Sequence, residues 1–374
     1  KEILVGRPCY EVVFDDGARV VTDADHLWFT LKSIGTNGKR AWGLRTTWEI
    51  GATLLTPDKK RAHKIPLSAP LDLPNAVLTI DPYILGVWLG DGTTEETSIT
   101  TADPEIEAAV GAYAESVGIR IRRRPDPRSR SVGLHLTTGH TGGKPNRVRQ
   151  ALRALGVWGT KHIPASYLRA SANQRWALLQ GLMDTDGSCG LNGACEFTTT
   201  LPALRDGMME LLSTLQIQGH MGEGRAMLRG RDCGPKFRIG FTVYRDRPVF
   251  RIPRKLERLR ARPTGKRGPL QTEFRQIIDV RVVGSRPVRC IAVDSPSNLF
   301  LVGRRMVPTH NTLVALMLAR ESIRAGERTA FVSIAAWQGV NDGTTPGGGG
   351  AHSSLTNPGM TTGDDHTQYV LLAG

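Results

Sequence analysis

The order of apolar and polar positions predicts a β-rich beginning of the chain. Cys9–Phe14 is a strand-like run, and the Asp-Gly pair at 16–17, followed by a second run at 18–22, is typical of a β-hairpin. Residues 41–55 continue in the same strand-like manner, and a Pro-rich stretch at 65–74 ends the segment. We therefore expect residues 1–75 to form strands.

The pattern changes near residue 81, where the first of several helices is predicted. A basic strand is predicted at 120–124, and the order helix, strands, helix occurs twice. Such internal similarity predicts an α/β domain with pseudo-symmetry. The helices are expected at 82–90, 104–117, 146–155, 173–183 and 201–215.

Strand-like sequence returns after a very basic stretch at 251–267, which we interpret as a linker. A β domain is thus interrupted by an α/β domain and then resumed. Beyond it, 312–325 predicts a helix with one apolar stripe and 328–334 a buried strand. Residues 341–374 are rich in Gly, Thr and Asp without periodicity, which indicates linker or disorder. The later strands are expected at 276–283, 288–293 and 299–302.

The net charge of +14 is unevenly distributed along the chain. Residues 341–374 contain no Lys or Arg and three Asp, so residues 1–340 carry +17, which is 14 plus 3. A surplus of that size suits a polyanion such as nucleic acid, although a solvated basic surface would have the same composition.

Cysteine usage and hydropathy exclude several classes of protein. The five cysteines are odd in number, widely spaced and without a CxxC pair, which disfavours a disulfide framework and a zinc site and fits a reducing cytosol. No apolar run is long enough to span a membrane, and no secretory signal pattern is present. We expect a cytoplasmic protein without a membrane partner. Because the chain begins at Lys1 in strand-like sequence, we also expect a fragment that lacks its natural beginning.

Two of the predicted helices share one sequence design. LGVWLGDG at 85–92 and LQGLMDTDG at 179–187 are apolar runs that end in Asp-Gly, with Asp91 and Asp186 at the ends. Internal glycines would let two such helices pack closely, and the Gly after each acid could adopt the left-handed conformation that ends a helix. The carboxylates would project from one end of the pair as oxygen ligands suited to Mg²⁺. One copy would be explained by ordinary helix termination, but two matched copies in a basic domain favour a metal site. The internal glycines are Gly86, Gly90 and Gly181.

These segments resemble the two motif helices of the LAGLIDADG homing endonucleases. The resemblance implies a pseudo-two-fold αββαββα nuclease whose saddle-shaped sheets hold double-stranded DNA, with Asp91 and Asp186 as metal ligands. It also implies that Lys161, in KHIP at 161–164, is the basic active-site residue of that family, with a solvated loop lysine as the alternative. Alternate residues of the basic strand would face the DNA groove. The candidate DNA contacts are Arg120, Arg122, Arg124, Arg128 and Arg130.

A second constellation, Thr309-His310-Asn311-Thr312, has the chemistry of self-cleavage. The Asn311 side-chain amide can attack its own carbonyl, which forms a succinimide and breaks the chain after this residue. His310 can protonate the leaving amide, and the Thr312 hydroxyl can first accept an acyl group as an ester. Because His-Asn-Thr also occurs by chance, the hypothesis depends on its position between strand-like sequence and a new domain.

This arrangement resembles an intein, a β-rich splicing domain of the Hint type that is interrupted by a homing endonuclease. The segments 288–294 and 306–312 match the two C-terminal splicing blocks, and 23–28 matches the second N-terminal block. The resemblance implies that His26 activates the N-terminal scissile bond. The family usually has Thr three positions before this His, where the present chain has Asp23.

Trp28, Cys290 and Thr309 stand where class 3 inteins have their Trp-Cys-Thr signature. The resemblance implies that Cys290 attacks the upstream junction and forms a branched thioester. The acyl group would pass to Thr312, and cyclisation of Asn311 would release the product. As alternatives, Cys290 would be a small buried hydrophobe and Trp28 a core aromatic. The first splicing block is absent, so the chain alone is not expected to complete splicing.

The sequence behind the junction resembles the part of a RecA-like ATPase that follows its phosphate-binding loop. Such loops end Gly-Lys-Thr with the hydroxyl on Mg²⁺, so Thr312 would be splice nucleophile first and metal ligand later. The host would be a P-loop ATPase, either a replicative helicase or a phage terminase, in a bacterial or phage-infected cell. Two rival interpretations are a free-standing LAGLIDADG endonuclease without splicing activity, and a binding module in which the Asp-Gly ends are only helix caps.

The predicted architecture is a β-rich Hint splicing domain interrupted by an α/β endonuclease. Its parts are an N-terminal Hint part (1–76), the endonuclease (77–255), a basic linker with the C-terminal Hint part (256–311), an ATPase-like helix and strand (312–340) and a Gly-rich tail (341–374).

Overall fold

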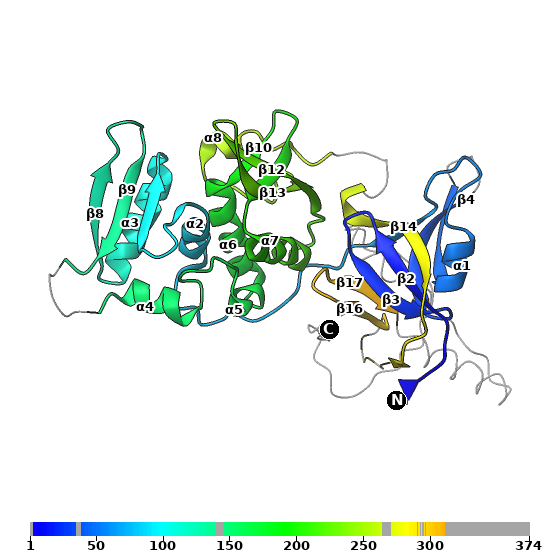
Figure 1. The fold of residues 1–374 in the computed structure, drawn as a ribbon. Coiled ribbons are helices and arrows are strands. Elements are labelled where there is room, and N and C mark those ends of the chain that lie inside the picture. The colour runs from blue at the N-terminus through cyan, green and yellow to red at the C-terminus, as the bar shows by residue number, and fades with distance from the viewer. Residues whose placement is uncertain are drawn as a thin grey trace, which may run out of the picture.

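The structure, a computed structural model, describes residues 3–34, 39–139, 145–263, 271–289, 291, 293, 295 and 297–310. In these ranges a helical region with two small sheets lies beside a β domain (Figure 1). The candidate residues Cys290, Asn311 and Thr312 lie outside the described residues, as do the predicted parts 312–340 and 341–374.

The β domain is built on a six-stranded sheet with the order β3-β2-β14-β6-β4-β5. Strand β14 pairs with β2 and with β6, although the whole helical region separates it from both in sequence. The predicted return to strands after that region is therefore confirmed. The strands are β2 (Cys9–Phe14), β3 (Arg19–Asp23), β4 (Leu27–Ile34), β5 (Lys39–Thr46), β6 (His63–Pro66) and β14 (Phe274–Val283).

Two short antiparallel pairs complete the β domain. Strands β1 (Ile3–Leu4) and β15 (Val288–Arg289) form one pair, and β16 (Leu299–Val302) and β17 (Val307–His310) form a hairpin. Val307 of this hairpin packs in the same apolar cluster as Phe14 and Trp28. Apolar burial therefore holds β17 against the main sheet.

The strand-like interpretation of 41–55 was wrong in its second half. Strand β5 ends at Thr46, and α1 (Thr47–Ala52) follows directly. The Thr46 hydroxyl accepts from the Glu49 N–H at 3.1 Å, and the Glu49 carboxylate accepts from the Thr46 N–H at 2.8 Å. This capping box starts a helix locally, against the apolar and aromatic composition of the stretch.

The helical region contains the five predicted helices, with ends shifted by one or two residues. Two short helices, α5 and α8, were not predicted. The helices are α2 (Pro82–Asp91), α3 (Pro104–Ser116), α4 (Arg147–Ala154), α5 (Ala165–Leu168), α6 (Ala172–Thr185), α7 (Pro202–Thr214) and α8 (Pro253–Leu256), and a 3-10 turn, η1 (Gln271–Glu273), leads back to β14.

The two halves of this region repeat one topology, as the pattern predicts. The first sheet has the order β7-β9-β8, and the second has the order β10-β11-β13-β12. The extra strand β10 pairs Gly187 with Phe197, and an isolated bridge between Gly92 and Ile99 takes its place in the first half. The strands are β7 (Ser98–Thr101), β8 (Arg120–Pro125), β9 (Val132–Thr137), β10 (Gly187–Cys189), β11 (Ala194–Thr199), β12 (His220–Leu228) and β13 (Arg231–Thr242).

One apolar core runs through both halves and includes part of the stretch interpreted as a basic linker. Ile252 and Leu259 are buried in this core, and Leu256 packs against it. In this segment basic residues are interspersed with apolar residues that face the core, so the basic composition hid a packed segment. The linker interpretation of 251–267 was therefore wrong for its first part.

Candidate nuclease and splicing sites

Helices α2 and α6 pack against each other through their glycines. A Cβ on Gly86 would come within 2.4 Å of a backbone oxygen of α6, and one on Gly181 within 2.2 Å of a backbone oxygen of α2. A Cβ on Gly90 would come within 2.0 Å of Thr185 Oγ1. Larger residues would push the helices apart, so the predicted close packing is confirmed.

The glycines that follow the two acids act differently from the prediction. Gly92 has a φ of −77°, and neither Gly92 nor Gly187 is among the described residues with positive φ, so the predicted left-handed caps were wrong. A Cβ on Gly92 would come within 2.4 Å of the Trp88 carbonyl oxygen, and one on Gly187 within 2.5 Å of the Met183 carbonyl oxygen. Glycine is needed because the chain turns sharply over the last turn of its own helix.

Asp91 and Asp186 lie at this common end of the helix pair, and the charge of Asp186 acts on Asp91. Burial raises the pKa of Asp91 to about 6, and the negative charge of Asp186 adds to the effect. Burial also raises the pKa of Asp186, although its side chain keeps contact with solvent. A divalent cation beside both carboxylates would relieve this repulsion, and carboxylate oxygens are the donors that Mg²⁺ prefers.

Lys161 lies beside the end of α2. Its Nζ donates to the Gly90 carbonyl oxygen at 2.9 Å and lies 5.4 Å from the centre of the Trp88 ring. Burial lowers the pKa of Lys161, and Asp186 and Asp91 oppose that shift. A buried ammonium that donates to a helix-end carbonyl oxygen is not a solvated loop lysine.

Lys255 of α8 is the counterpart that the sequence analysis missed. Its Nζ donates to the carbonyl oxygens of Asp184 and Gly187, both at 2.7 Å, and of Met183 at 3.0 Å. It thus satisfies the carbonyl groups at the end of α6, as Lys161 does at the end of α2. An available signal was an Ile-Pro pair beside each lysine: residues 163–164 directly precede α5, and residues 252–253 are the N-cap and first residue of α8.

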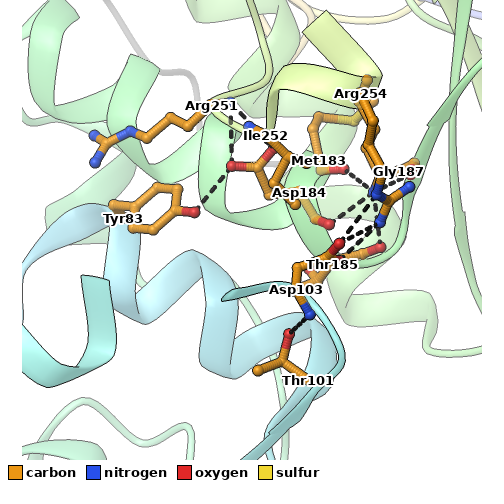
Figure 2. Close-up of polar contacts among 11 residues, drawn as sticks. Tyr83, Thr101, Asp103, Met183, Asp184, Thr185, Gly187, Arg251, Ile252 and Arg254 are labelled. Carbon is orange, nitrogen blue, oxygen red and sulfur yellow. Dashed lines mark hydrogen bonds and ion pairs between the residues drawn. The ribbon is translucent and has the colours of Figure 1, made fainter. Parts of the chain in front are cut away.

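A polar cluster fixes α8 against both halves (Figure 2). The Tyr83 hydroxyl donates to Asp184 Oδ2 at 2.9 Å, and the Arg251 N–H donates to the same carboxylate at 3.1 Å. Arg254 makes a bidentate ion pair with Asp103 at the start of α3, with the shorter contact at 2.7 Å. The segment that carries Lys255 therefore connects the first half to the second.

The predicted DNA contacts lie on and beside β8. Arg120, Arg122 and Arg124 are exposed on one face of the strand, and Ile121 on the other face packs against the core. Arg123 shares the Ile121 side and is held by Glu107 of α3 at 2.7 Å. The predicted alternation is therefore present in the strand. Arg128 and Arg130 are exposed in the loop between β8 and β9.

The second sheet presents a different surface. A hollow of about 510 Å³ lies over its outer face, with Ser188, Glu196, His220 and Thr242 among its lining residues. This face is therefore mixed in polarity, whereas the exposed side chains of the outer face of β8 are all arginines.

The splicing candidates in the described residues meet in the β domain. His26 Nε2 and Thr309 Oγ1 share a hydrogen bond, although the two residues are 283 positions apart. Burial, and then the charge of His310, lower the pKa of His26 to about 4. Trp28 is fully buried, and its ring lies 5.2 Å from the His26 ring, centre to centre. His310 is buried at the end of β17.

A supporting residue of this site, Thr47, was also missed. Its hydroxyl accepts from Trp28 Nε1 at 3.0 Å and contacts the Thr22 hydroxyl at 3.0 Å. The same hydroxyl lies 3.3 Å from the His26 carbonyl oxygen, to which it donates. Thr47 is the first residue of α1, so the unpredicted helix orients the segment that carries His26 and Trp28.

Comparisons with known proteins give one extended similarity, and no family model matches the chain. A replicative DNA helicase DnaB of Mycobacterium intracellulare is 36% identical over 335 residues, which cover 85% of this chain and 53% of the relative. A replicative DNA helicase DnaB of Mycobacterium leprae (strain TN) is 42% identical over 52 residues, or 14% of this chain and 9% of the relative. The chain thus spans about half the length of the first relative and much less of the second.

Among solved structures, I-DmoI in complex with DNA and Ca is 12% identical, with a TM-score of 0.35, over 48% of this chain and 95% of that one. I-DmoI in complex with DNA and Mn is 13% identical, with a TM-score of 0.32, over 45% of this chain and 92% of that one. No helix among the described residues is long and apolar enough to cross a membrane.

Proposed function

We propose that the chain is a self-splicing β domain of the intein type that carries a Mg²⁺-dependent, LAGLIDADG-type double-strand DNA endonuclease. The observation that carries the nuclease assignment is the paired helix end, where two acids and two buried lysines converge from pseudo-symmetric elements. Burial and the charge of Asp186 raise the pKa of Asp91, and perturbed pKa values of this kind cluster at functional sites.

Asp91 and Asp186 would hold the divalent cation, which clamps the scissile phosphate and activates water for in-line attack. The described residues contain no group of three or more His, Cys, Asp or Glu side chains that could form a complete cage. Water and DNA phosphate oxygens would supply the other ligands, as is usual for Mg²⁺. The positive charges of Lys161 and Lys255 would stabilise negative charge on the phosphate.

DNA would lie across the outer faces of the two sheets. Arg120, Arg122 and Arg124 would contact one half-site, and the mixed face over β10–β13 would contact the other. Because base contacts specify and phosphate contacts position, we expect the first half-site to be bound mainly through charge.

A cleavage assay tests the nuclease assignment. Plasmid that carries the uninterrupted DnaB-type gene should become linear with Mg²⁺ and stay intact with a chelator. The double variant Asp91→Asn and Asp186→Asn should be inactive, while Glu105→Gln with Glu115→Gln, two exposed acids of α3, should remain active. Cleavage by the Asp91→Asn, Asp186→Asn variant would reject the metal site.

The splicing assignment is supported by the contact of His26 with Thr309, next to Trp28 and His310. In the proposed reaction the Asn311 amide nitrogen attacks the Asn311 carbonyl carbon, the peptide bond to Thr312 breaks, and the new amino group takes up a proton. His310 is the proposed source of that proton. A neutral His26 at pH 7, consistent with its pKa of about 4, can orient the Thr309 hydroxyl without adding charge to an apolar site.

Intact-mass measurement over time tests this step. The purified chain should separate into fragments 1–311 and 312–374, and Asn311→Ala should remain whole. Persistent integrity of the wild-type chain would instead favour a free-standing endonuclease.

Cys290 is the proposed initiating nucleophile, by the class 3 resemblance. The Cys290 thiolate would displace the amine of the upstream junction and form a thioester, and the Thr312 hydroxyl would then take over the acyl group as an ester. With the upstream segment restored, Cys290→Ala should abolish splicing but leave cleavage after Asn311 intact. Full splicing by that variant would exclude the class 3 route.

The proposed host is a DnaB-type replicative helicase. The similarity to the mycobacterial helicase supports this host over a phage terminase. Insertion directly before Thr312 would keep the phosphate-binding loop divided until splicing, so ATPase activity should appear only in the spliced product.

A further inference from the structure

The helical region, residues 82–256, carries the proposed nuclease site and is called the nuclease region from here on. It contacts the hairpin that leads to the proposed cleavage site. Figure 1 shows β16–β17 between α7 and the strands β2 and β3. Arg305 lies in the turn of this hairpin, and its side chain is only 18% exposed. Its Nη2 donates to the Gly219 carbonyl oxygen at 3.2 Å and to the Asp16 carbonyl oxygen at 2.8 Å. Gly219 lies between α7 and β12, so one guanidinium joins three segments that are distant in sequence.

A buried ion pair holds the β-domain side of this junction. Arg275 of β14 donates to Asp16 Oδ2 at 2.7 Å, and both side chains are at most 2% exposed. Arg275 also donates to the Arg305 carbonyl oxygen at 2.9 Å. The turn is therefore held through its backbone as well as through its side chain. Gln218 adds a contact from the nuclease side, since its Nε2 donates to Asp15 Oδ1 at 2.8 Å.

An apolar contact supports the same turn. Met306 has a φ of 48°, a left-handed conformation, and its side chain is buried with Leu71 and Leu301. The Leu71 N–H donates to the Thr214 carbonyl oxygen of α7 at 3.0 Å, and Arg175 of α6 donates to the Leu71 carbonyl oxygen. The nuclease helices thus fix Leu71, and Leu71 packs on the turn.

Strand β17 transmits the position of this turn to the candidate splicing residues. It begins at Val307, directly after Met306, and ends at His310, which precedes Asn311 in sequence. Thr309, in the same strand, contacts His26. All four residues of β17 pair with β16, so a shift of the turn moves Thr309 and His310 with it.

We propose that the 218–219 turn of the nuclease region is a docking site for the β16–β17 hairpin, and that Arg305 is a positioning residue for cleavage after Asn311. The inference rests on the proposed splicing function. It makes the nuclease region part of the scaffold of the splicing site, in addition to its own DNA chemistry.

Four variants of the full chain test this role. Arg305→Ala should slow cleavage after Asn311 by on the order of tenfold, because small misplacements of reacting groups are costly, while DNA cleavage stays unchanged. Arg305→Lys keeps a cation beside Asp16 and should restore part of the rate. Gln218→Ala, which removes only the contact to Asp15, should have a smaller effect. The matched control is Arg304→Ala in the same turn. Arg304 is 73% exposed, and its ion pair with Glu210 of α7 is long, at 3.6 Å, so its loss should matter less.

The outcomes separate this inference from the splicing proposal itself. If the wild-type chain and Arg305→Ala are cleaved after Asn311 at the same rate, the positioning role alone is overturned. Equal slowing by Arg304→Ala would overturn it too. A wild-type chain that never cleaves would overturn both proposals. If Arg305→Ala also loses DNA cleavage through misfolding, Arg305→Lys decides the question. Normal DNA cleavage by Arg305→Lys with slow cleavage after Asn311 supports the positioning role. Equal recovery of both activities contradicts it.

Discussion

At the ends of α2 and α6 burial raises the pKa of two acids, Asp91 and Asp186, whereas at the candidate splicing site of the β domain it lowers the pKa of His26. Desolvation disfavours the charged form in both cases. It therefore raises the pKa of Asp91 to about 6 and lowers the pKa of His26 to about 4. The acids lie among lysines and are suited to a cation, while His26 lies against Thr309 and Trp28 and is suited to proton positioning. The same physical effect thus suits two parts of one chain to the two different chemistries proposed for them.

The geometry of the two sites differs as well. The candidate nuclease site comes from two matched helices, so a short sequence pattern locates it. The candidate splicing site comes from β4 and β17, which meet only because the chain returns to the β domain after the helical region. We expect the two sites to work independently in their chemistry, and the following predictions test this.

The largest expected effects are two reciprocal losses. Asp91→Asn with Asp186→Asn should reduce DNA cleavage below detection while cleavage after Asn311 proceeds at the wild-type rate. Asn311→Ala should do the reverse. Both activities are measured on the same preparations, by plasmid linearisation and by intact mass. Loss of both activities in either variant would contradict independent sites.

The next effect distinguishes the two lysines. Lys255→Met and Lys161→Met should each slow DNA cleavage by about 10²–10⁴-fold at saturating Mg²⁺, the range for positioned catalytic groups. Lys255→Met should also lower the melting temperature more, because Lys255 serves several carbonyl groups of α6 and Lys161 serves one of α2. Equal melting temperatures would show that the two halves are supported alike.

A smaller effect concerns the basic face of β8. Changing Arg120, Arg122 and Arg124 to Ala should weaken DNA binding and reduce the slope of log affinity against log salt by about 2–3, roughly 0.9 for each phosphate that is no longer neutralised. Arg123→Ala is the matched control, because Glu107 already holds Arg123 on the other face. Binding is measured by titration at several salt concentrations. An equal change with Arg123→Ala would contradict the assignment of the outer face.

The smallest effect is a pH dependence of stability in the β domain. His63 is buried, and desolvation lowers its pKa to about 4 from its usual 6.5. Between these values the unfolded chain binds a proton that the folded chain does not. The free energy of unfolding should therefore fall as pH decreases from 6.5 towards 4, by at most about 1.4 kcal/mol per pH unit for this group.

His63→Gln should reduce this slope. Asp91 contributes with the opposite sign, since its raised pKa favours the folded state at low pH. The His63 contribution is therefore measured as the difference between variants in denaturant unfolding at pH 4.5 and 7.

Local sequence determined those features that depend on neighbouring residues. The apolar runs before Asp91 and Asp186, and the glycines within them, predicted two helices in close contact because helix formation and steric size are local properties. The alternating arginines of β8 were predictable for the same reason, since side chains of a strand alternate between its faces.

Only the tertiary structure decided which distant residues meet. Lys255 joins the proposed nuclease site because α8 packs over the end of α6. Thr47 joins the proposed splicing site because the start of α1 contacts Trp28 of β4. Gly92 and Gly187 are required by the path of the chain over each helix end rather than by a left-handed φ. Arg305 connects the two regions through carbonyl oxygens, which every residue has, so no sequence pattern could identify its partners. Such contacts arise from packing between segments, and their energies appear only once the fold has brought the segments together.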